Sequence, residues 1–119
     1  MISENAKDLS KIGIFESKSY KMIQKIEILN KLRKSKSELN KFGVIRIGLF
    51  GSVIRDESTE DSDVDVLINF EPEQETFENY MNTCNFLESI FKGFKLDIVT
   101  ENGLSPFIGP SILKEVEYA

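Results

Sequence analysis

The sequence predicts an α+β domain in which helices flank a small β-sheet, with the elements in an order like that of α/β proteins. The first observation is its size and composition: 119 residues, 40% hydrophobic and 29% charged, suit one globular domain with one core. The second is that three short runs rich in β-branched residues alternate with segments whose apolar residues recur at helical spacing.

Three segments have the helical spacing. Residues 19–41 carry an apolar stripe and stop before Gly43, which predicts an amphipathic helix. Its apolar positions are Ile23, Ile26, Leu29, Leu32, Leu39 and Phe42. A second helix is expected over 76–91 and a short last one around 112–118. The apolar side of the second helix is formed by Phe77, Tyr80, Met81, Cys84, Leu87, Ile90 and Phe91.

The residues before the first helix are polar and weakly patterned. We expect residues 1–18 to form a partly ordered N-terminal extension and residues 19–119 to form the domain. Strands are predicted at 44–50, 64–70 and 95–100 from their β-branched and aromatic content. A short helical turn is expected directly after the first of these strands.

Composition excludes several kinds of site. The chain has no histidine, which rules out Ser-His-Asp and Cys-His catalysis and the usual histidine-containing zinc sites. Its one cysteine, Cys84, and the lack of a recognisable signal peptide lead us to expect the reducing cytoplasm. No apolar run is long enough to span a bilayer, so no membrane partner is expected.

The charge is unevenly distributed. Residues 1–46 carry 11 basic and 5 acidic residues, whereas residues 47–119 carry 4 and 15. The basic half is interpreted as a solvated helix face or as a surface for an anionic partner. The acidic half argues against direct nucleic-acid binding, because phosphates need Lys or Arg to neutralise them.

Three aspartates lie in or directly before two of the predicted strands. Asp63 and Asp65 share one face where a polar loop enters the second strand, and Asp97 interrupts the third. Each could be a turn cap or a partner of a backbone or arginine group. Together they favour a divalent-cation site, and a donor set of oxygens alone suits Mg²⁺ or Mn²⁺.

A glycine-serine pair ends the first predicted strand. At Gly51 and Ser52 the chain can bend sharply, and the following amides and the serine hydroxyl could bind an anion. A plain turn is the alternative. The short distance in sequence from this pair to Asp63 and Asp65 favours a phosphate contact beside a metal site.

These motifs together resemble the minimal nucleotidyltransferases (MNT) of the DNA polymerase beta superfamily. The resemblance covers residues 23–119 and rests on the segments Gly48–Arg55 (GLFGSVIR), Ser62–Leu67 (SDVDVL), Leu96–Val99 (LDIV) and Ser111–Tyr118. It implies a mixed β-sheet in the nucleotidyltransferase fold.

The resemblance also implies a site and a partner. Asp63, Asp65 and Asp97 would hold two Mg²⁺ ions around ATP, the substrate, and act as the catalytic residues, while Gly51 and Ser52 would contact its phosphates. Arg55 is a further candidate phosphate contact, with a surface ion pair as the alternative. Small members of the family act as antitoxins that transfer AMP from ATP to a tyrosine of a HEPN-domain RNase toxin.

Two other functions stay open. The chain could neutralise a toxin by binding alone, or it could transfer a nucleotide to a small molecule. Transfer to a small molecule usually needs a further domain that encloses the acceptor, which 119 residues do not provide. A structural protein with an incidental acidic loop is the remaining interpretation.

Overall fold

A computed structural model describes residues 14–59 and 61–119, with the side chains of the first helix described from Gln24 onward. Of the predicted extension over residues 1–18, residues 1–13 lie outside the described residues, whereas residues 14–18 begin the first helix. The main elements in chain order are α2 (Ile14–Lys34), α3 (Lys36–Lys41), β1 (Val44–Phe50), β2 (Val64–Phe70), α4 (Phe77–Ile90), β3 (Leu96–Thr100), α5 (Gly109–Glu115) and β4 (Glu117–Tyr118). Two short 3₁₀ helices, η1 (Pro72–Gln74) and η2 (Glu101–Gly103), lie between them.

The four strands form one mixed sheet in the order β3-β2-β1-β4. β1 pairs antiparallel with β2 and with β4, whereas β2 and β3 are parallel. The parallel pair is possible because α4 carries the chain back across the sheet between β2 and β3. This confirms the α+β class and the mixed sheet.

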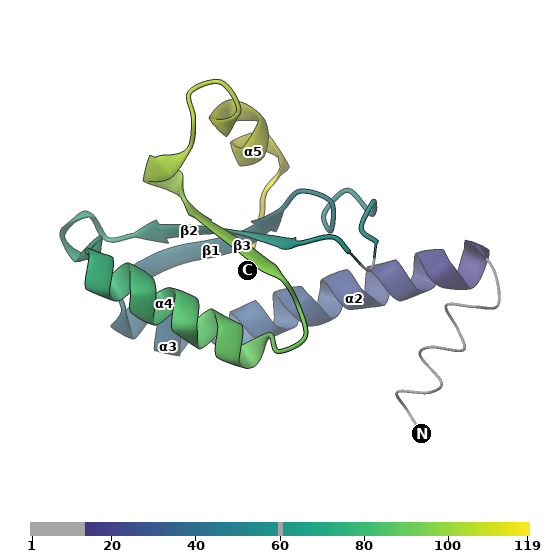
Figure 1. The fold of residues 1–119 in the computed structure, drawn as a ribbon, viewed down its shortest axis with the longest axis horizontal. Coiled ribbons are helices and arrows are strands. Elements are labelled where there is room, and N and C mark those ends of the chain that lie inside the picture. The colour runs from purple at the N-terminus through teal and green to yellow at the C-terminus, as the bar shows by residue number, and fades with distance from the viewer. Residues whose placement is uncertain (1–13, 60) are drawn as a thin grey trace.

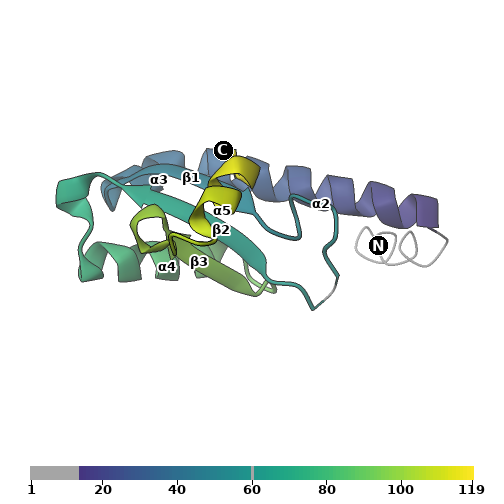
Figure 2. The same ribbon diagram turned by 90° about the horizontal axis from the view of Figure 1, so that it is seen from above.

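The two faces of the sheet are covered differently. Helices α2, α3 and α4 lie on one face, and α5 lies on the other (Figure 1). Seen from above, α5 lies over the middle of the sheet (Figure 2). Residues 64, 66, 68 and 70 of β2 join the main core, as their alternation predicts. Leu67 is fully buried although it points to the opposite face, the one over which α5 lies.

The predicted helix over 19–41 is two helices. It starts earlier than expected, at Ile14, and breaks at Ser35. The Ser35 hydroxyl donates to the Lys31 carbonyl at 2.8 Å, and this bond to the preceding turn competes with the regular backbone pattern. The stripe is also rotated: Ile28 is buried, and Ile26 is 51% exposed.

The end of the chain differs from the prediction. The last helix begins at Gly109 and ends at Glu115, and residues 117–118 form β4 instead of a helical turn. The Ala119 amide then donates to the Ile47 carbonyl at 2.8 Å, so the end of the chain is hydrogen-bonded to β1. Short helices are marginal on their own, and the unpaired edge of β1 offers backbone partners.

Helix α4 has the predicted position but not the whole predicted face. Leu87 and Phe91 are buried, whereas Phe77 is 80% exposed and Met81 is 38% exposed. Both exposed residues lie in the first half of the helix. No helix among the described residues has the length and hydropathy that crossing a membrane would need.

The corrected face of α4 predicts two different mutational costs. Leu87→Ala should lower the free energy of unfolding by about 3 kcal/mol, because it leaves a cavity in the core. Phe77→Ala, on the same predicted stripe, should change it by less than about 0.5 kcal/mol. Urea denaturation of both variants measures the difference. Equal costs would contradict this helix register.

Candidate active site

Asp65 lies at the centre of the candidate site because of strand register. In the antiparallel pair of β1 and β2 it is opposite Phe50, the last residue of β1. In the parallel pair of β2 and β3 it is opposite Asp97. Asp63 lies two residues before Asp65, just ahead of β2. The end of β1 and the starts of β2 and β3 therefore lie together at one end of the strands. We call this end of the sheet the site edge.

Gly51 continues directly from Phe50 and touches Asp65. Its φ of +76° lies in the left-handed region, where a side chain is strained. A Cβ at this position would collide with the Asp65 carboxylate. Glycine is therefore required twice here, once by its backbone conformation and once by the close approach of Asp65.

The segment after Gly51 is a single hydrogen-bonded turn, at the place where a short helical turn was expected. The Arg55 amide donates to the Gly51 carbonyl at 3.1 Å, and the Glu57 amide donates to the Ser52 carbonyl at 2.8 Å. The turn closes through Asp56, whose φ of 59° is left-handed. Ser52 is half-buried at the start of this turn, directly after Gly51.

The charges at this edge perturb Asp65. Its pKa is raised from 3.8 to about 6, chiefly by burial and then by the negative charges of Asp97 and Asp63; the Arg55 charge opposes the shift. Asp97 and Asp63 themselves are exposed. The site thus has a half-buried inner carboxylate and an exposed outer one across the β2–β3 pair.

The donor set of Asp65 and Asp97 fits Mg²⁺. Magnesium prefers oxygen ligands and is usually held by one or two carboxylates together with water and substrate phosphates. A cation would also remove the repulsion that raises the Asp65 pKa. Among the described side chains no three acidic or thiol groups cluster closely enough to form a metal cage.

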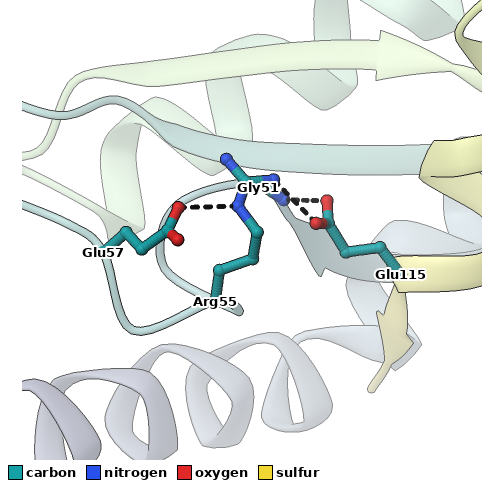
Figure 3. A network of polar contacts seen from close by, with 4 residues as sticks. All are labelled: Gly51, Arg55, Glu57 and Glu115. Atoms are coloured by element: carbon teal, nitrogen blue, oxygen red, sulfur yellow. Dashed lines mark hydrogen bonds and ion pairs between the residues drawn. The ribbon is translucent and has the colours of Figure 1, made fainter.

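A carboxylate from the other end of the chain joins the glycine turn. Glu115, the last residue of α5, accepts a hydrogen bond from the Gly51 amide at 2.7 Å through Oε2 (Figure 3). Its Oε1 accepts one from Arg55 Nη1 at 2.7 Å. Arg55 Nε also donates to Glu57 at 2.9 Å, so the guanidinium lies between two carboxylates.

These bonds fix the charge states of the network. Burial opposes ionisation of Glu115, but the hydrogen bonds from Arg55 and the Gly51 amide outweigh it and lower its pKa. The pKa of Arg55 is raised, first by Glu57 and then by Glu115. Arg55 is exposed and occupied by ion pairs, which was the alternative to a phosphate contact.

The structure therefore brings together Gly51, Asp65 and Asp97, with Asp63 close enough to raise the Asp65 pKa. Ser52 follows Gly51 directly in the chain. Sequence reasoning missed Glu115. It lies 64 residues from Gly51 in the chain, in a half already rich in acidic residues. No local spacing marks it, because its role depends on where α5 is placed over the sheet.

The chain is similar to known proteins over most of its length. Residues 29–119 match the family model described as a nucleotidyltransferase domain. The chain is 40% identical over 93 residues to the protein adenylyltransferase MntA of Thermococcus cleftensis, covering 77% of this chain and 92% of the relative. It is 38% identical over 95 residues to MJ1379 of Methanocaldococcus jannaschii, provisionally named a protein adenylyltransferase, covering 77% and 94%.

A solved structure resembles the fold as well. It is provisionally described as a minimal nucleotidyltransferase and is 35% identical in sequence, with a TM-score of 0.60. The match covers 75% of this chain and 93% of that chain. The sequence matches and the structural match each cover about three quarters of this chain.

The raised pKa of Asp65 predicts a pH-dependent cost that Asp65→Asn should remove. Between pH 4 and pH 6 the folded state holds a proton that the unfolded state has lost, so this group destabilises the fold as pH rises. The full shift corresponds to about 3 kcal/mol, which screening of this half-exposed group reduces to about 1 kcal/mol.

Without divalent cations, Asp65→Asn should therefore melt about 4 °C above the wild type at pH 7.5 and close to it at pH 4. Thermal melting across this pH range measures the difference. Asp61→Asn, an exposed acid in the same loop, is the control and should show no such trend. A pH-independent difference for Asp65→Asn would contradict the assignment.

The contact between Gly51 and Asp65 predicts that Gly51→Ala costs more than backbone strain alone. Gly93 also has a left-handed φ, of +91°, but nothing lies within 4 Å of its missing Cβ. Gly93→Ala should cost about 1 kcal/mol and Gly51→Ala about 3 kcal/mol. Denaturant unfolding compares the two, and equal costs would exclude a tight contact with Asp65.

Proposed function

The chain belongs to the nucleotidyltransferase domain family, and from this we propose that it is an antitoxin that adenylylates a partner toxin. In this proposal it transfers AMP from Mg-ATP to a tyrosine of a HEPN-domain RNase and so silences it. The observation that carries the proposal is the meeting of Asp65, Asp97 and the Gly51 turn at one sheet edge. The names of two similar relatives as protein adenylyltransferases support a protein acceptor.

In this proposal the glycine turn binds the phosphates and the aspartates bind the metal. The Ser52 hydroxyl and the turn amides orient the triphosphate, as backbone donors do for anions elsewhere. Asp65 and Asp97, with Asp63 at their side, are the residues that would hold magnesium. A bound cation supplies charge neutralisation for the phosphate oxygens and helps the leaving group depart.

Asp97 is the proposed acceptor of the tyrosine proton. A tyrosine hydroxyl has a pKa of about 10, so a base beside it favours attack. The phenolic oxygen forms a bond to the α-phosphorus, and the bond from this phosphorus to the β-phosphate bridging oxygen breaks. The proton passes to the Asp97 carboxylate, and pyrophosphate leaves with the negative charge.

The exposure of the site suits an acceptor as large as a protein. Asp97 is exposed on β3, the strand at the edge of the sheet. A tyrosine on another folded protein can approach an exposed edge, whereas a small acceptor would need walls that exclude water. This favours a protein acceptor over a small molecule such as an aminoglycoside.

The decisive experiment follows label from α-labelled ATP to the partner toxin. Asp63→Ala and Asp65→Ala should each reduce transfer at least about 100-fold while the protein stays folded, because the substitutions remove repelling charges. Asp61→Ala is the matched control and should keep wild-type transfer. Full transfer by Asp63→Ala or Asp65→Ala would refute the proposed site.

Co-expression separates catalysis from neutralisation by binding alone. Cells that make the toxin should survive with the wild-type chain and die with the Asp65→Ala variant. Mass spectrometry of the rescued toxin should find one added AMP or more on a tyrosine. Protection by Asp65→Ala at equal protein levels would instead favour a non-catalytic antitoxin.

A further inference from the structure

We propose that Glu115 is a built-in competitor of the nucleotide's phosphates, held against the glycine turn until triphosphate displaces it. This rests on the proposed function in one respect, the use of the Gly51 turn as the phosphate contact. It adds a regulatory role for α5, which brings a carboxylate to that turn from the far end of the chain.

The Glu115 carboxylate is bound as an anion in an anion site. One oxygen takes the Gly51 amide and the other takes the Arg55 guanidinium, both at 2.7 Å. An amide at a glycine turn together with a guanidinium is also the donor pair that suits a phosphate oxygen. The Glu115 side chain is only 21% exposed, so the contact is set into the protein surface.

Occupation by Glu115 withdraws both donors from a nucleotide. The Gly51 N–H is engaged by Glu115 Oε2, and Arg55 is held between Glu115 and Glu57 (Figure 3). A triphosphate at this turn would also lie beside the negative charge of Glu115, and like charges a few ångströms apart repel. Phosphate binding and the Glu115 contact therefore oppose each other.

Helix α5 is suited to release this contact. Gly109 is its only buried residue, whereas Leu113 on the helix and Ile108 just before it are 47% and 58% exposed. An element with little buried apolar surface can shift at low cost. After Glu115 the chain leaves the helix through Val116, in extended conformation, into the two-residue strand β4. A movement of α5 can thus withdraw the carboxylate without unfolding the core.

Glu115→Gln tests the proposal because it keeps the shape of the side chain and removes its charge. Binding of Mg-ATP and of inorganic tripolyphosphate, measured by titration calorimetry, should tighten about tenfold. Glu57→Gln is the matched control, since it also removes one charge and one partner of Arg55 but has no bond to Gly51. Its affinity should tighten much less than that of Glu115→Gln, because Glu115 still occupies the Gly51 amide.

Unchanged or weaker binding by Glu115→Gln would show that Glu115 only stabilises the turn. If Glu115 only held the turn in shape, Glu115→Gln would bind both ligands as weakly as the wild type or more weakly, and the proposal would be overturned. Equal tightening in Glu57→Gln would overturn it too, because general charge would then explain the effect. Tripolyphosphate binding needs neither AMP transfer nor a tyrosine, so failure of the proposed function is distinguishable from failure of this inference.

Discussion

The close approach of the Asp65 carboxylate to the backbone of Gly51 is the constraint on which the site depends. Asp65 has Asp97 on its other side in the strand register, so it is confined between a backbone turn and a second negative charge. Such an arrangement costs stability unless a cation or a proton relieves it. A protein that needed only to fold would gain from a neutral residue here, which is the physical reason to assign this edge a function.

The second determinant is the electrostatic balance around the glycine turn. Arg55 is the positive group that offsets the Asp65 charge, yet it is bound to Glu57 and Glu115. Any change in the position of α5 therefore alters the hydrogen bond of the Gly51 amide. It also alters the electrostatic effect of Arg55 on Asp65. The C-terminal segment is thus part of the site in energetic terms, although no site role was assigned to its residues from the sequence.

The strands were predictable from the sequence because their signal is local. The bounds of β1 and β2 agree with the runs of β-branched residues, and the core residues of β2 lie on the face opposite the one that Asp63 and Asp65 were predicted to share. Helix faces were less predictable. The break at Ser35 accompanies a side-chain hydrogen bond, and the exposure of Phe77 depends on how α4 packs in the folded domain. The periodicity of apolar residues predicts neither.

The sequence by itself determined the class of the fold, the glycine-serine turn and the two aspartates that lie a short loop beyond it. Those features follow from the chemistry and spacing of residues near one another in the chain. The tertiary structure alone decided that Asp97 lies opposite Asp65, that β4 pairs with β1 and that Glu115 reaches Gly51. Contacts of this kind depend on strand register and on helix placement, which are set by packing across the whole domain.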